Sequence, residues 1–158
     1  LSKAVFNEEK NSLIISIDSR KNKKVIEFAQ NYEWIHGSKE VIIHEEKLGL
    51  KNHIYFCGDL TEKYENIIIL EDDLFVSPYF YDFAKKTLHF YKDDERVAGI
   101  SLYNYEVTEN LQFSFKPVDD GSDVYFLQFA SSWGQLFTKI NWIKFRECNK
   151  INEIKFNR

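Results

Sequence analysis

At 158 residues the chain is long enough for one domain with its own hydrophobic core and too short for two ordinary domains. Apolar residues make up 44% and charged residues 29%, a mixture typical of a globular protein and not of a disordered one. The formal net charge of −4 argues against a protein that holds a nucleic acid backbone, and no apolar run approaches the roughly 20 residues of a membrane span.

Three features of composition indicate what kind of domain this is and where in the cell it is expected. Aromatic residues make up 16%, more than a small core needs, so we expect some of them to line a groove. Cys57 and Cys148 lie far apart without the spacing of a zinc site, which favours reduced thiols and a cytoplasmic location. There is no methionine, not even at position 1. We therefore expect residues 1–158 to form a single, partial domain of a longer protein.

The first half of the chain alternates predicted strands and helices. Short apolar runs predict strands at 12–18, 40–44 and 66–70, and apolar residues at helical spacing predict helices at 23–34 and 48–64. The run at 66–70 is β-branched and apolar on both faces, which is typical of a central strand in a parallel sheet. This alternation predicts an α/β fold with helices on both faces of the sheet.

Weaker signals continue the pattern after residue 70. Ser77 and Pro78 predict the N-cap and first position of another helix. Residues 97–101 predict a short buried strand, 124–129 a further strand, and 139–148 a short helix.

Three acids, Glu71, Asp72 and Asp73, follow directly after the predicted central strand. In open α/β sheets, ligands bind in the crevice beyond the carboxyl ends of the strands. Carboxylates are hard oxygen ligands suited to Mg²⁺ or Mn²⁺, ions that commonly bridge a protein carboxylate to substrate phosphates. The alternative is that Asp72 and Asp73 merely end the strand in water. Because three crowded acids repel one another unless a cation offsets their charge, both interpretations stay open.

Three other places along the chain give weaker signals. Gly49 and Lys51 open a predicted helix, whose N-terminal amides suit a phosphate, although an ordinary exposed helix start has the same pattern. Asp18 ends the first strand and has the chemistry to accept hydrogen bonds from a base or ribose, and an ordinary acid at a strand end is the alternative. Trp133 beside Gly134 has a ring suited to the face of a sugar, and a buried core tryptophan is the alternative.

Taken in order, these motifs resemble those of GT-A fold glycosyltransferases. In particular they are similar to the Golgi N-acetylglucosaminyltransferase I family, which starts complex N-glycans, and to related bacterial sugar transferases. The resemblance covers residues 12–142. The segments that carry it are the strand ending at Asp18, residues 47–53 (KLGLKNH), 68–74 (IILEDDL), 77–78 (SP), 101–103 (SLY) and 132–134 (SWG).

The resemblance implies a GT-A-like mixed sheet and a metal-dependent glycosyltransferase of polysaccharide biosynthesis. Such an enzyme transfers a sugar from a nucleotide-diphosphate donor, here a UDP-sugar, to a hydroxyl of a sugar or glycan acceptor. The implied ligands of Mn²⁺ or Mg²⁺ are Asp73 and Asp72. The implied donor-binding residues are Asp18, Lys51, His53, Glu71 and Asp72, with Asp18 and His53 near the uracil. The implied residues on the acceptor or sugar side are Trp133 and Gly134.

Two parts of the family pattern are missing. The family's first strand should precede residue 12, and residues 1–11 do not supply it. The general base of the inverting members should lie beyond Trp142, where Glu147 is the only acid close by and matches poorly. We therefore expect a domain that is incomplete at both ends, with its catalytic residue unassigned. The resemblance favours inverting transfer, and the alternative function is a non-catalytic fragment that binds a nucleotide sugar.

Residues 68–73 also resemble the acidic pocket of a signalling receiver domain. A receiver domain has that strand near its start, followed by a phosphorylatable Asp on a later strand end and then by a Lys. Here the strand lies in mid-chain and those partners are missing, so the sequence argues against a receiver domain.

Overall fold

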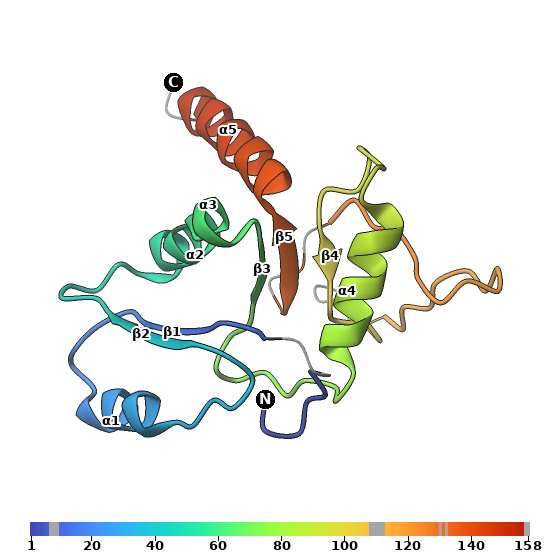
Figure 1. The fold of residues 1–158 in the computed structure, drawn as a ribbon. Coiled ribbons are helices and arrows are strands. Elements are labelled where there is room, and N and C mark those ends of the chain that lie inside the picture. The colour runs from blue at the N-terminus through green and yellow to red at the C-terminus, as the bar shows by residue number, and fades with distance from the viewer. Residues whose placement is uncertain (7–9, 108–112, 130, 132, 157–158) are drawn as a thin grey trace.

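The computed structural model describes residues 1–6, 10–107, 113–129, 131 and 133–156 (Figure 1). Its elements are β1 (Leu13–Ile17), α1 (Lys23–Asn31), β2 (Lys39–Ile43), α2 (Leu50–Asp59), α3 (Thr61–Tyr64), β3 (Asn66–Ile69), α4 (Phe80–Tyr91), β4 (Ile100–Ser101), β5 (Gln135–Thr138) and α5 (Lys139–Phe156). The fold is mixed α/β, and the strands form two small sheets.

The first sheet is a parallel pair of strands, β1 and β2, joined through α1. Parallel neighbours need a crossover connection, and the predicted strand–helix–strand order supplies one. Lys39 at the start of β2 donates from its Nζ to three carbonyl oxygens at the end of α1, at 2.7–3.1 Å. Its charge also meets the negative end of the helix dipole. α1 therefore ends at Asn31, before the predicted limit at residue 34.

The second sheet is antiparallel, with the strand order β3-β5-β4. Gln135 at the start of β5 pairs with Ile69 on one side and with Ser101 on the other. Among the described strands, β3 is thus an edge strand, and the prediction of a central strand in a parallel sheet is wrong. Ile68 of β3 packs against the core that includes Ala84 of α4, and α2 and α3 also contact β3.

Helices cover both faces of the second sheet, as the sequence predicts. Leu136 of β5 packs in a core with Ala84 of α4. The next residue, Phe137, points to the opposite face because side chains alternate along a strand. There its ring lies 5.1 Å from that of Trp142, a side chain of α5 that is only 2% exposed.

The helix predicted at 48–64 is two helices, with the break at Leu60. Gly58, near the end of α2, lies directly against Trp142: a Cβ atom built on this glycine would be 2.0 Å from the indole ring. The fully buried Thr61 then donates from its hydroxyl to the Gly58 carbonyl oxygen at 2.8 Å. The glycine therefore permits a close approach between α2 and α5.

Other boundaries also differ from the prediction. α4 begins at Phe80, because Ser77 accepts a hydrogen bond from the Tyr79 N–H in a turn before the helix and does not cap it. β4 is only two residues long. Residues 124–129 form no strand, and α5 extends beyond residue 148. Among the described helices, none is long and apolar enough to cross a membrane.

We expect Gly58→Ala to destabilise the protein by about 1–3 kcal/mol, because the new methyl group must displace the Trp142 ring. Helix propensity alone predicts the opposite sign, a gain of about 1 kcal/mol for Ala over Gly. Urea unfolding measures the free energy of unfolding. The loss of unfolding free energy caused by Gly58→Ala should be smaller in a protein that also carries Trp142→Leu. A Gly58→Ala protein that is more stable than the original chain would contradict the close packing.

Candidate functional site

The three acids that follow β3 lie in a turn that is open to water. The N–H of Leu74 donates to the carbonyl oxygen of Glu71 at 3.3 Å, which closes the turn. Asp72 and Asp73 are exposed, and Glu71 is half-buried. Within the described ranges, none of these three side chains has a salt bridge or a hydrogen bond. We call Glu71, Asp72 and Asp73 the acid run.

The acid run shares an edge of the second sheet with the start of β5. Because β3 and β4 both run antiparallel to β5, their C-terminal ends meet its N-terminal end. Gly134, just before β5, is packed so closely that a Cβ atom there would lie 3.4 Å from Leu70 and 3.3 Å from Leu102. The N–H of Leu102 also donates to the carbonyl oxygen of Gly134 at 2.8 Å. The structure thus brings Trp133 and Gly134 to the edge from which the acid run leaves.

Trp133 presents part of its ring to solvent. Its side chain is 42% exposed, so the alternative of a buried core tryptophan is wrong. The ring packs edge-on against Tyr103, with 4.7 Å between the centroids. The backbone N–H of Trp133 donates to the hydroxyl of the buried Ser131 at 3.2 Å. Ser132, the first residue of the predicted SWG motif, lies outside the described residues.

Asp18 has a structural partner at the start of α2. Its Oδ1 accepts from the N–H of Leu48 at 2.7 Å and from that of Gly49 at 3.2 Å. Gly49 is the N-cap residue, with a φ of 76° that favours glycine. Asp18 therefore anchors the segment that leads into α2, and α2 itself has no side-chain cap. A phosphate at Gly49 and Lys51 would have to compete with Asp18.

Lys51 and His53 lie on the first turns of α2. The Nζ of Lys51 is 5.6 Å from the centre of the Tyr55 ring, a cation–π distance. The Nε2 of His53 lies 2.7 Å from the hydroxyl of Ser16, and the Nε2 of His44 approaches the same hydroxyl at 3.2 Å. Two strand ends and one helix therefore form a small polar cluster.

The environment of this cluster changes two ionisation equilibria. Burial lowers the pKa of the His53 imidazole, an effect that the Asp18 carboxylate opposes and that His44 reinforces. Burial likewise raises the pKa of the Cys57 thiol, and a side-chain hydrogen bond with Ser16, which favours the thiolate, opposes this effect. Both groups are therefore favoured in their neutral forms.

Ser16 and His44 are not among the site residues predicted from the sequence. The signal was available: Ser16 lies near the end of β1, and His44 directly follows β2. Because the C-terminal ends of adjacent parallel strands meet at one edge of the sheet, Ser16 and His44 are expected to lie close together there.

The residues predicted to bind the donor fall into two groups. Asp18, Lys51 and His53 lie around the start of α2, and the acid run lies beyond β3. Among the described residues, no hydrogen bond or salt bridge joins Asp18 or His53 to the acid run. In Figure 1 the loop from β2 to α2 lies at the far left, whereas the chain leaving β3 descends near the centre towards α4.

Two kinds of metal site are relevant to the acid run: one built from protein ligands alone, and one that the protein shares with a phosphate ligand. Among the described residues, no three or more His, Cys, Asp or Glu side chains are placed to hold a metal ion together. The residues therefore do not fit a centre built from protein ligands alone. The exposed Asp72 and Asp73 do fit an ion that takes one or two protein carboxylates and completes its shell with phosphate oxygens and water.

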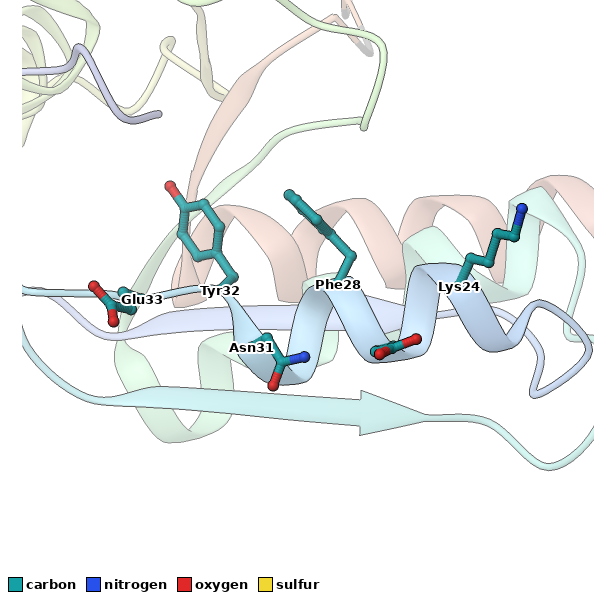
Figure 2. Close-up of a pocket in the computed structure, with 6 residues that line it drawn as sticks. Lys24, Phe28, Asn31, Tyr32 and Glu33 are labelled. Atoms are coloured by element: carbon teal, nitrogen blue, oxygen red, sulfur yellow. The ribbon is translucent and has the colours of Figure 1, made fainter.

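A shallow hollow lies elsewhere, along α1 (Figure 2). Its lining residues are Lys24, Glu27, Phe28, Asn31, Tyr32 and Glu33. Figure 2 shows Lys24, Phe28 and Tyr32 standing on one side of the helix, and the rings of Phe28 and Tyr32 are 5.9 Å apart. None of the predicted site residues lines this hollow.

No family model matches the chain, and no curated protein or solved structure matches it.

We expect the free energy of unfolding to fall as the pH drops below about 6.5, the usual pKa of histidine. The unfolded chain protonates His53 there, while the folded protein, in which the pKa is lowered, resists protonation. His53→Gln should flatten the dependence between about pH 7.5 and about pH 5.5, measured by urea unfolding. The matched control is His89→Gln at an exposed position of α4. Equal slopes in the original chain and in His53→Gln would contradict the assignment.

Proposed function

We propose that the chain is the nucleotide-sugar-binding part of a metal-dependent glycosyltransferase. The observation that carries the proposal is the acid run: three carboxylates at a strand end, open to water and without a described partner. Like charges crowded in this way repel one another unless a cation offsets them. Mn²⁺ or Mg²⁺, bound together with a donor diphosphate, supplies that cation and uses few protein ligands.

The three acids have different roles in this proposal. Asp73 is the principal protein ligand of the metal, and Asp72 binds the ribose or completes the metal shell. The half-buried Glu71 faces the donor sugar. When bound, the metal neutralises charge that develops on the departing diphosphate. These roles follow from the resemblance of residues 68–74 to the family's metal motif.

Sugar transfer breaks the bond from the anomeric carbon to the diphosphate and forms a bond to an acceptor oxygen, whose proton passes to a base. Glu147 is poorly placed to be that base. Thr138, at the end of β5, pairs with Asn66 at the start of β3, and α5 begins with the next residue, Lys139. α5 therefore leaves from the edge opposite the acid run, and the proposal assigns no base within this chain.

The placement of the predicted donor-binding residues favours binding by residues 1–158 of the donor diphosphate and the metal, and not contact with the whole nucleotide sugar. Asp18 is engaged with the start of α2, and the structure describes no contact from Asp18 or His53 to the acid run. Binding of a UDP-sugar diphosphate and a metal needs only the acid run. Cys57 and Cys148 are free thiols, which agrees with the proposed cytoplasmic location.

We expect metal and nucleotide to strengthen each other's binding, because each supplies part of the other's site. In the original chain, Mn²⁺ should raise the affinity for UDP about tenfold, measured by calorimetric titration. Asp73→Asn keeps the shape of the side chain and removes its charge, so it should abolish this coupling and leave the fold intact. Asp93→Asn, at another exposed acid, is the matched control. If Asp73→Asn and the original chain show the same metal dependence, Asp73 only ends the strand.

We also expect residues 1–158 alone to transfer or hydrolyse sugar from a UDP-sugar very slowly, because the family's first strand and its general base are not recognisable in this sequence. The measurement is release of UDP from UDP-N-acetylglucosamine and UDP-glucose with Mn²⁺ present. Turnover near the common enzymatic value of about 10 per second would show that the chain holds a base of its own.

A further inference from the structure

Four aromatic side chains gather at the edge where β4 ends and β5 begins. Tyr103 packs edge-on against both Tyr105 and Trp133, with centroid distances of 4.9 and 4.7 Å and interplanar angles of 89° and 83°. Phe129 extends the group, with its ring 5.7 Å from that of Tyr105. Edge-to-face contacts of this kind are favourable for aromatic rings. We call these four residues the aromatic cluster.

Backbone contacts fix the cluster in place. The N–H of Tyr103 donates to the hydroxyl of Ser101 in β4 at 3.2 Å, and that of Trp133 donates to the buried Ser131. The N–H of Tyr105 donates to the hydroxyl of Tyr125 at 3.4 Å. Rings that are held in advance lose little conformational entropy when a ligand binds.

The cluster is exposed although its rings contact one another. Exposed fractions are 37% for Tyr103, 42% for Trp133 and 58% for Phe129, while Tyr105 is half-buried. Aromatic side chains that served only the core would be covered, as Trp142 is at 2%. Contiguous exposed apolar surface of this kind commonly marks a binding site.

Charge and position restrict what the cluster binds. The acid run lies at the same edge of the sheet, and the exposed Glu106 follows Tyr105 in the chain. A polyanion such as a nucleic acid strand would be repelled there. A neutral pyranose has a face of C–H bonds, which suits the negative face of an aromatic ring. Its hydroxyl groups suit polar groups at the rim such as Asn104, which already accepts a hydrogen bond from Tyr125.

We propose that the aromatic cluster is the acceptor subsite and binds a neutral hexopyranose of an oligosaccharide. This inference rests on the proposed function, because it assigns the acceptor side of the same site. It adds Tyr103, Tyr105 and Phe129 to Trp133, and it makes acceptor binding independent of the metal. A sugar stacked on this cluster lies at the sheet edge from which the acid run leaves.

The test measures saccharide binding to the full chain without nucleotide or metal. The probes are N,N′-diacetylchitobiose, lactose and maltotriose, followed by saturation-transfer NMR and by calorimetric titration. We expect at least one of them to bind, with transfer from aromatic protons of the protein to the C–H protons of the sugar. Trp133→Ala and Tyr103→Ala should each weaken this binding about tenfold or more.

The matched control is Phe126→Ala, which removes an aromatic ring that is 67% exposed and packs on Tyr91 of α4, outside the cluster. It should leave saccharide affinity unchanged. If Trp133→Ala fails to fold, Trp133→Phe keeps a ring of smaller area and should weaken binding less than Tyr103→Ala. Absence of binding by all three saccharides, or an equal loss in Phe126→Ala, would overturn the proposal.

The same proteins separate this proposal from the proposed function. Asp73→Asn should bind saccharides as the original chain does, and Trp133→Ala should keep the coupling between Mn²⁺ and UDP. Two other occupants of the cluster would each refute the saccharide assignment. One is a nucleobase, indicated by loss of UDP affinity in Trp133→Ala; the other is a second copy of the chain, indicated by a dimer in sedimentation that Trp133→Ala abolishes.

Discussion

The hydrogen-bonded position of β5 between β3 and β4 is the constraint on which the rest of the structure depends. Because β5 runs antiparallel to both neighbours, it brings the segment before it to the edge where β3 and β4 end. It also directs Leu136 to α4 on one face and Phe137 to Trp142 on the other. One strand of four residues thus joins the core of the second sheet to the placement of the acid run and the aromatic cluster.

Elements with strong local signals were predictable, and those that depend on distant partners were not. β1, β2 and β3 have short apolar runs, and α1 and α4 have clear apolar spacing, so the sequence predicts their presence and type. The sequence does not predict β5, because Gln135–Thr138 has a weak local pattern. This segment is a strand because it pairs with β3 and β4. The opposite error occurred at 124–129, where aromatic and β-branched residues suggested a strand. Phe126 and Phe129 there are exposed side chains of a segment that does not pair.

The same distinction applies to the candidate site. The acid run needs only a strand end, so the sequence predicts where it lies. The hydrogen bonds of Asp18 to the segment before α2 join two parts of the chain about thirty residues apart, and nothing near Asp18 in the sequence signals them. The cluster of Ser16, His44 and His53 likewise forms only when β1 and β2 pair. Tertiary contacts thus determine whether a polar side chain remains available to a ligand.

The unequal burial of the three tryptophans has a consequence for spectroscopy. Trp142 of α5 is buried against α2 and β5. Trp34 is half-buried, and its indole N–H donates to the carbonyl oxygen of Asn11 at 2.7 Å. Trp133 is exposed at the edge of the second sheet. Water around an indole shifts its emission to longer wavelength and admits small collisional quenchers. The red side of the intrinsic fluorescence therefore reports on Trp133, and the blue side reports on the core, so one chain contains an internal probe and an internal reference.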